Sequence, residues 1–220
     1  MFKFICFLNG VCAVLICLTV SVFLSAFSRG FYEREFDKLN ISEETGLQRA
    51  ELNAVALDLI DYMKGKNDAL TVKVHINGEY LPFFNEREIL HMEDVRTLFI
   101  YAYSGVALCL VFFSCLIAWA LIKKNANVAY YTANSMICIL IACVLLTVFI
   151  AFNFERSFIY FHKIFFNNDL WILDPDTDML INIVPIGFFI DACKRIALHF
   201  VFLNIICISL LKIFPRMYKT

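Results

Sequence analysis

Among the four histidines of the sequence, His91 has neighbours that suit acid–base chemistry. Glu88 lies three residues before it and Asp94 three residues after it. Residues three apart on a helix share a face, so both carboxylates can reach the side of the helix that carries the histidine. An imidazole with an ordinary pKa near 6.5 accepts or donates a proton at neutral pH. His91 is therefore a candidate acid, base or hydrogen-bond donor.

His162 is the second candidate, and its surroundings differ. It lies in the stretch FIYFHKIFFNNDLWILDPDTD (158–178), which is crowded with aromatic residues and ends in closely spaced aspartates. Asn167, Asn168 and Asp169 follow the histidine. The apolar segments of the chain place both histidines at one depth on the same side of a bilayer, in two stretches that should meet. We therefore expect His91 and His162 to form a shared site.

The other two histidines have simpler interpretations. His75 falls on the polar face of a predicted β-hairpin, where a solvent-exposed ring is expected. His199 falls inside the last apolar segment, where it is either a packed polar residue or a functional one. The sequence leaves these two roles of His199 open.

Other motifs give little support for a metal or for serine chemistry. Asp174, Asp176 and Asp178 have the first spacing of a calcium-binding loop, but Met179 stands where that loop needs glycine and Pro185 where it needs glutamate. The sequence has no H-E-x-x-H, no G-x-S-x-G and no P-loop motif. We therefore expect no metal and no cofactor.

The composition predicts a membrane protein. Hydrophobic residues make up 61% of the 220 residues, well above the half that is usual for soluble domains. Four segments are long and apolar enough to cross a bilayer, which takes about 20 helical residues. They comprise residues 4–27, 98–122, 128–152 and 192–214, and the first is too long for the apolar region of a usual cleaved signal peptide. The net charge of −1 gives no reason to expect a nucleic-acid partner.

Basic residues next to these segments predict the orientation. Short cytoplasmic segments carry an excess of lysine and arginine. Three such segments agree, and their basic residues are Lys3, Lys123, Lys124, Lys212, Arg216 and Lys219. We therefore expect both termini in the cytoplasm. Residues 28–97 and 153–189 would then form a cap on the outer side.

The first outer segment reads as a small α+β unit. Residues 42–64 have helical periodicity. Alternating β-branched residues lie before Asn77-Gly78, a good hairpin signal. Asn85, with Glu88 three residues later, predicts a capping box at the start of the next helix.

The second outer segment is aromatic and suits an element lying at the membrane surface. Asp176 can cap a short helix that ends before Pro185. The fold class expected for the whole chain is thus an α-helical membrane protein, a four-helix bundle with a small α+β extracytoplasmic cap.

The sequence has nine cysteines, and each lies in or beside an apolar segment. Neither outer segment contains one. Such a pattern fits free thiols that pack as small apolar residues, and it argues against a disulfide framework.

Three stretches carry a family resemblance: FYEREF (31–36), FNEREILHMEDVR (84–96) and FHKIFFNNDLWILDPDTDMLINIVPIGFF (161–189). With four apolar segments and a cap, the chain resembles the bacterial lipoprotein intramolecular transacylases, the Lit family, over nearly its whole length. The pattern of that family places two catalytic histidines at the interface of cap and membrane. The resemblance assigns these roles to His91 and His162.

The resemblance implies a specific acyl transfer. Lit proteins act on a lipoprotein whose N-terminal cysteine carries a diacylglyceryl group. They move the sn-2 acyl chain to the α-amino group of the same cysteine, which gives a lyso-form lipoprotein. The implied partners are the diacylated lipoprotein N-terminus and membrane lipid, and the implied active site lies at the outer face of the cell membrane.

Within this reaction, His162 is expected to remove the amine proton and return it to the sn-2 oxygen. His91, oriented by Glu88 or Asp94, is expected to stabilise the oxyanion or to take part in the proton transfer. The opposite assignment of the two histidines remains open.

Supporting roles are expected for the residues around His162. An amide of Asn167 or Asn168 would donate to the oxyanion, and Asp169 or Asp174 would orient the ring. Aromatic residues would hold acyl chains and exclude water, notably Phe161, Phe165 and Trp171.

Two other functions fit the residues without the resemblance. The first is a non-enzymatic membrane sensor or accessory subunit whose cap binds a protein. The second is a membrane-embedded lipid hydrolase, which would need a path for water to the site. Substitution of the histidines separates these functions, because only the enzymes would change a lipid product.

Overall fold

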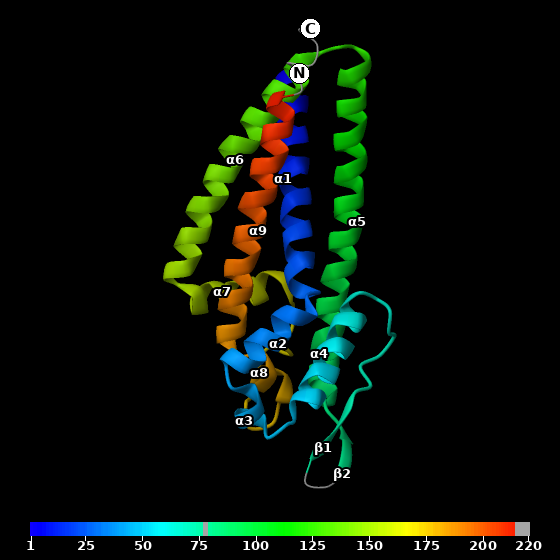
Figure 1. Cartoon of the computed structure of the whole chain (residues 1–220), viewed down its shortest axis with the longest axis vertical. Coiled ribbons are helices and arrows are strands. Elements are labelled where there is room, and N and C mark those ends of the chain that lie inside the picture. Colours follow the sequence, from blue (N-terminus) through cyan, green and yellow to red (C-terminus); the bar gives the residue numbers. More distant parts are fainter. Residues whose placement is uncertain (77–78, 214–220) are drawn as a thin grey trace. The chain divides into compact units, whose positions relative to one another are not determined.

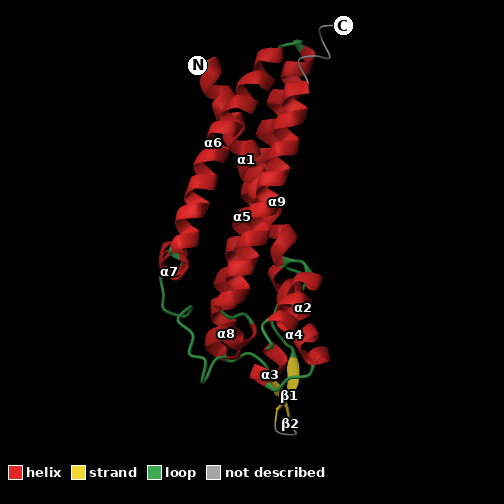
Figure 2. Ribbon diagram, turned by 60° about the vertical axis from the view of Figure 1, so that its left-hand side comes forward, coloured by secondary structure: helices red, strands yellow, loops and turns green. Residues whose placement is uncertain are grey.

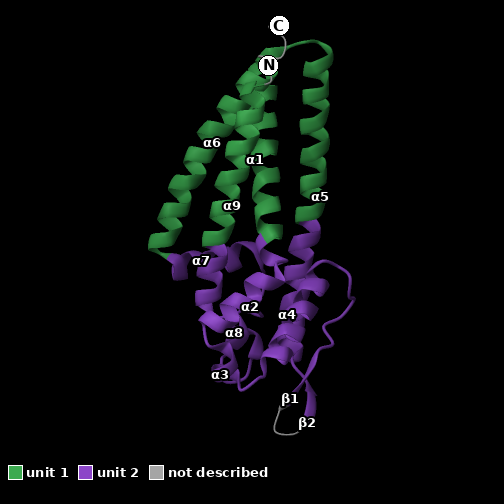
Figure 3. Ribbon diagram, in the orientation of Figure 1, with its two compact units in different colours: residues 1–24, 102–153, 194–220 green, residues 25–101, 154–193 purple. Residues whose placement is uncertain are grey.

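The computed structural model describes residues 1–76 and 79–213 (Figure 1). The chain divides into two compact units (Figure 3). The first unit contains residues 1–24, 102–153 and 194–220, and the second contains residues 25–101 and 154–193. Both candidate histidines belong to the second unit.

Four helices of the described residues are long and apolar enough to cross a membrane. They are α1 (Phe2–Ala26), α5 (Glu86–Ile122), α6 (Ala126–Phe152) and α9 (Ile186–Ile213). The expected helical fold with four apolar helices is confirmed to this extent. Helices α5 and α9 begin well before the predicted apolar segments, so the helix predicted after Asn85 and the second apolar segment are one continuous helix. Residue 214, the predicted end of the fourth segment, lies outside the described residues.

The first unit packs its helices through small and polar side chains. A Cβ atom at Gly10 of α1 would lie 2.7 Å from the Cβ of Ser135 on α6, so only glycine permits this approach. At the preceding residue of α1, the Asn9 amide donates to the Thr132 hydroxyl of α6 at 3.4 Å. Close contact of small residues and polar bonds between helices are the usual means of association in lipid. The apolar windows of α5 and α6 are only 6% buried, which suits contact with acyl chains.

The second unit begins with three helices, shown red in Figure 2. They are α2 (Arg29–Lys38), α3 (Ile41–Thr45) and α4 (Arg49–Met63). The single helix predicted over residues 42–64 is therefore wrong, because the chain breaks at Gly46, whose φ of 70° is left-handed. The predicted apolar face of the second part is confirmed, since Leu52, Val55, Leu59 and Tyr62 are all buried.

The predicted hairpin is confirmed as strands β1 (Lys73–Ile76) and β2 (Glu79–Pro82), which pair antiparallel with His75 opposite Tyr80. The turn residues Asn77 and Gly78 lie outside the described residues. Two carboxylates of α4 accept hydrogen bonds from this strand region, Glu51 from the His75 N–H at 2.9 Å and Asp58 from the Val72 N–H at 3.0 Å. Within the described residues, this hairpin is the β part of the unit.

The remaining helices of the second unit are α7 (Phe154–Phe165) and α8 (Met179–Ile183). The sequence predicted Asp176 as the cap of the short helix, but the N-cap position is Asp178, whose side chain makes no cap hydrogen bond. The acceptor for this helix comes from elsewhere, because the Leu180 N–H donates to the carboxylate of Glu88 on α5. Pro185 follows the helix as expected.

Candidate active site

His91 and His162 converge within the second unit. His91 lies in the first turns of α5 and His162 in the last turn of α7. Their ring centroids are 6.1 Å apart, with an interplanar angle of 34°. Only 7% of His91 and 8% of His162 remain exposed. A small group bound between the rings can therefore contact both imidazoles while it is largely shielded from water.

The hydrogen bond of His162 defines which nitrogen is free. Its Nδ1 lies 2.7 Å from the carbonyl oxygen of Phe158, one turn earlier on α7. A carbonyl only accepts, so the Nδ1 carries the hydrogen and the Nε2 keeps its lone pair. Burial lowers the pKa of His162, and the bond to Phe158 opposes this effect. The ring is therefore neutral at physiological pH and can accept a proton at Nε2.

His91 is held differently. Its Nδ1 is buried and has no hydrogen-bond partner among the described residues. His91 lies ahead of the apolar segment of α5 that begins near residue 98, so its environment is protein rather than acyl chains. Burial, followed by the proximity of His162, lowers the pKa of His91 to about 4, while Asp94 acts in the opposite direction. The ring is thus neutral, and the described residues leave its Nδ1 without a hydrogen-bond partner.

Aromatic rings enclose His162. Phe158 is 4.3 Å and Trp171 4.9 Å from its ring, and Trp171 is stacked on it. Phe161 makes an edge contact at 5.5 Å, and Phe166 contacts both histidines. The predicted Phe165 packs on Phe161 at 4.7 Å rather than on the histidine. Such walls favour an acyl chain and disfavour water.

Glu88 is fully buried, but its carboxylate is not directed to His91. One oxygen accepts from the Asn85 N–H at 2.7 Å, and the Asn85 side chain accepts from the Glu88 N–H at 3.0 Å, so the predicted capping box is confirmed. The other oxygen accepts from the Leu180 N–H of α8. Burial raises the pKa of Glu88, and the N–H groups of Leu180 and Asn85 oppose this effect. Glu88 therefore joins the start of α5 to α8, a link between distant segments that no local motif reveals.

Asp94 and Arg87, also on α5, hold the loop that follows α7. The Asn168 amide donates to Asp94 at 2.9 Å, and the Asn168 side-chain oxygen accepts from the Leu170 N–H. Arg87 donates to the carbonyl oxygens of Asp169 and Ile172. Arg87 was not among the residues predicted from the sequence, because its contacts are to backbone atoms far along the chain. Asn168 thus has a structural role in this loop.

Asp174 and Asp178 stabilise the next turn. Asp178 accepts from the Asp174 N–H at 2.7 Å and from the Asn85 amide at 2.7 Å, while Asp174 accepts from the Asp176 N–H at 3.0 Å. Neither Asp169 nor Asp174 donates to or accepts from His162, whose Nδ1 is bound to Phe158 instead. The predicted orientation of His162 by these aspartates is therefore replaced by a backbone carbonyl. In the described part of the chain, no three His, Cys, Asp or Glu side chains are close enough to hold a metal ion.

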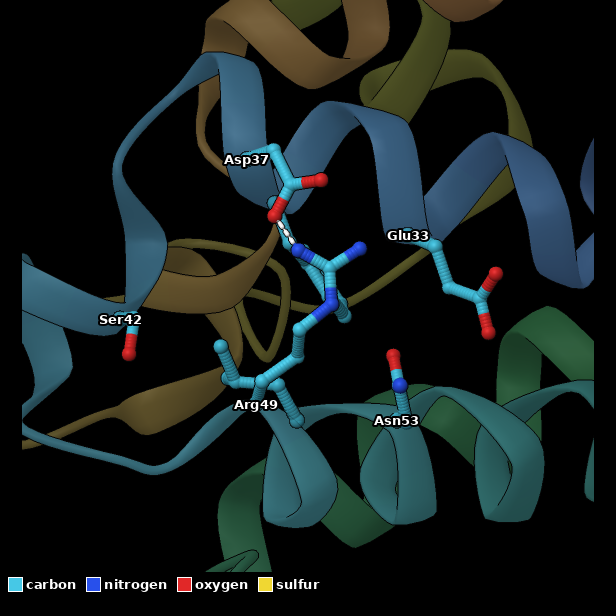
Figure 4. Close-up of a pocket in the computed structure, with 7 residues that line it drawn as sticks. Glu33, Asp37, Ser42, Arg49 and Asn53 are labelled. Atoms are coloured by element: carbon cyan, nitrogen blue, oxygen red, sulfur yellow. Dashed lines mark ion pairs between the residues drawn. The ribbon is translucent and has the colours of Figure 1, made fainter.

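Two pockets lie in the second unit. One, of about 540 Å³, is lined by residues of α7 and the following loop, including Asn167, Asp169 and Trp171. The other, of about 230 Å³, lies between α2 and α4 (Figure 4). There Arg49 forms an ion pair with Asp37, and the Ser42 hydroxyl donates to the Leu47 carbonyl. Neither pocket has a histidine in its lining, and the smaller one contains none of the predicted site residues.

Comparisons with known proteins identify the family and the fold of this chain. A family model described as lipoprotein intramolecular transacylase Lit matches residues 7–189. An uncharacterized protein of Aquifex aeolicus is 27% identical over 179 residues, which cover 79% of this chain and 77% of that protein. The solved structure of the membrane-integral lipoprotein intramolecular transacylase Lit of Bacillus cereus has the same fold. It matches with a TM-score of 0.84 and 24% identity, covering 100% of this chain and 98% of that chain.

A variant of the Bacillus cereus protein in which one histidine is replaced by alanine has also been solved. It matches with a TM-score of 0.82 and 23% identity, covering 100% of this chain and 96% of that chain. These likenesses establish a shared fold.

Proposed function

Since this chain belongs to the lipoprotein intramolecular transacylase (Lit) family, we propose that His91 and His162 are the groups that carry its acyl transfer. The reaction moves the sn-2 acyl chain of a diacylglyceryl-cysteine lipoprotein from oxygen to the α-amino group of the same cysteine. The product is a lyso-form lipoprotein with one N-acyl and one O-acyl chain. The observation that carries the proposal is the pair of neutral, buried imidazoles 6.1 Å apart.

His162 is the base of the proposed mechanism. The α-amino group has an ordinary pKa near 7.7–8.0, so it is mostly protonated at neutral pH and must lose a proton before it attacks an ester. The Nε2 of His162 is free to take the proton, because the Nδ1 hydrogen is already donated to Phe158. As the new N–C bond forms and the ester C–O bond breaks, His162 returns this proton to the departing sn-2 oxygen, and the second proton that the nitrogen loses on becoming an amide is released to solvent.

His91 is the proposed oxyanion donor. Its Nδ1 is buried without a partner, and such a group has a free-energy cost unless a bound molecule satisfies it. A neutral imidazole with its hydrogen on Nδ1 donates to the tetrahedral oxyanion when substrate is present. The lowered pKa keeps the ring neutral, so it does not compete with the amine for a proton. Asn167, which lines the larger pocket, is a candidate second donor.

The proposed site also accelerates the reaction by holding the amine close to the ester carbonyl. The nucleophile and the ester belong to one substrate molecule, and well-aligned intramolecular reactions gain about 7–11 kcal/mol. The rings of Phe158, Phe161 and Trp171 around His162 provide a surface on which an acyl chain can be fixed. They also keep water from the carbonyl carbon, where it would hydrolyse the ester.

The four apolar helices make the chain an integral membrane protein. We further propose that both termini lie in the cytoplasm and the histidine pair on the outer side. The basic residues Lys3, Lys123, Lys124 and Lys212 support this orientation. A reporter that is active only outside the cytoplasm, fused after residue 152, should be active, and the same reporter fused after Lys124 should be inactive. Activity of both fusions or of the second alone would refute the orientation.

Substitution of His162 by alanine tests the mechanism. The change should lower the rate of lyso-form production by about 100- to 10,000-fold, the usual effect of a general base. Mass spectrometry of the lipoprotein N-terminal peptide measures the product. His75→Ala is the matched control, because the His75 side chain is 68% exposed on the hairpin. Undiminished lyso-form production by His162→Ala would exclude His162 as the base.

A further inference from the structure

The larger pocket shares two of its lining residues with the aromatic surroundings of the proposed base. It has a volume of about 540 Å³ and is lined in part by Ile159, Lys163, Phe166, Asn167, Asp169 and Trp171. Two of these walls also contact the catalytic ring, since Phe166 is 5.6 Å and Trp171 4.9 Å from His162. A group bound in this pocket is therefore separated from the base by the ring of one aromatic residue.

The backbone of the pocket loop is held from outside. Arg87 donates to the carbonyl oxygens of Asp169 and Ile172, the latter at 3.0 Å. Asp94 accepts from the Asn168 amide at 2.9 Å. These contacts engage the backbone of Asp169 and leave its exposed carboxylate without a hydrogen bond or ion pair to any described residue. A carboxylate on a fixed loop, at a pocket beside the base, suits a cationic ligand.

We propose that this pocket binds the protonated N-terminal amine of the lipoprotein, with Asp169 as its ion partner. The proposal rests on the proposed function, because it concerns the substrate of that reaction. Amide and ammonium donors in the same lining, Asn167 and Lys163, suit the carbonyl oxygens of the first peptide bonds. Asp169 collects the amine in the form that predominates at neutral pH, and the amine then passes the shared aromatic residues to reach His162, which removes the proton.

The same ion pair favours binding of the substrate over binding of the product. The diacylglyceryl part of the substrate has no charge, so the ammonium group is the feature that Asp169 recognises. Once the nitrogen is acylated it is an uncharged amide, and the attraction to Asp169 is lost. The site therefore prefers lipoproteins with a free N-terminus and releases its own product.

Binding can be measured without turnover. A dialkylglyceryl-cysteine peptide, in which ether bonds replace both esters, cannot transfer a chain. Its N-acetylated counterpart lacks only the charge. The sequence has two tryptophans, and Trp119→Phe leaves Trp171, in the pocket, as the sole tryptophan, whose emission can be excited apart from that of tyrosine. Trp119 lies in the apolar part of α5, away from the proposed chemistry.

In the Trp119→Phe background, the free-amine peptide should bind about 3- to 10-fold more tightly than the acetylated peptide at pH 7, as expected for one charge-assisted contact at an exposed site. Asp169→Asn should abolish this preference and Asp169→Glu should keep part of it. Lys163→Gln, which removes a charge of the opposite sign from the same lining, should not reduce it.

The preference should also disappear above about pH 9, where the amine has lost its proton. The charged and titratable groups around the pocket are Lys163, Arg87, Asp94 and His162, and each is present in both the parent and the Asp169→Asn variant. An unchanged preference in Asp169→Asn, or equal binding of the two peptides by the parent, would overturn the proposal. Neither result bears on lyso-form production, which tests the proposed function separately.

Discussion

Replacement of Glu88 by glutamine should destabilise the protein strongly, although its carboxylate bonds to backbone N–H groups and not to His91. Both carboxylate oxygens accept backbone N–H groups, one from Asn85 at 2.7 Å and one from Leu180 on α8. Hydrogen bonds to charged groups each contribute about 1.5–3 kcal/mol. Glutamine keeps the volume and one acceptor oxygen, so one N–H keeps its acceptor and the other faces an amide N–H. We expect a loss of about 2–3 kcal/mol.

This loss converts to a measurable change in melting temperature. For a chain of this size, 1 kcal/mol corresponds to about 2–4 °C, so the apparent Tm in detergent should fall by about 4–12 °C. Glu86→Gln is the matched control, since Glu86 is exposed in the same first turn of α5. Both variants must be heated at the same rate, because unfolding of such proteins is often irreversible.

Lyso-form production should fall with the Tm in Glu88→Gln. His91 lies one turn after Glu88, and loss of the link to α8 loosens the start of the helix that positions the imidazole. On the same scale of about 2–4 °C per kcal/mol, a Tm for Glu88→Gln within about 1–2 °C of that of Glu86→Gln would show that the two hydrogen bonds accepted by Glu88 contribute little to stability.

Three further predictions follow from particular contacts. Because burial lowers the pKa of His162, protonation of this ring should reduce kcat/KM only below pH 6.5, in addition to the effect of the substrate amine, and an acid limb above pH 6.5 would contradict the burial argument. The unfolded ring binds a proton near pH 6.5 and the folded ring does not, so the free energy of unfolding should also decrease as the pH is lowered below 6.5. Arg87→Met should release the pocket loop and raise KM about 3- to 10-fold, as expected for loss of hydrogen bonds to a charged group, whereas Arg29→Met, at an exposed ion pair, should leave KM unchanged in the same assay. Gly10→Leu should lower the apparent Tm, because even a Cβ would lie 2.7 Å from Ser135, whereas Gly105→Leu has open space and should not.

The sequence by itself determined the elements that depend on local patterns. Apolar runs long enough to cross a bilayer mark α1 and α6 almost to their ends, because the bilayer imposes their length. The capping box of Asn85 and Glu88 and the β1–β2 hairpin follow from residues only a few positions apart. The sequence also predicted that His91 and His162 meet, because both lie in the outer segments, on the same side of the apolar runs.

Only the tertiary structure decided how these parts meet. The 6.1 Å separation of the histidine rings, the bond from His162 to the Phe158 carbonyl and the second partner of Glu88 on α8 all depend on packing. The break at Gly46 was missed because residues on both sides of it continue a helical pattern. Local patterns determine which backbone conformation is favoured, but burial and long-range hydrogen bonds determine which atom of a side chain is left free to react.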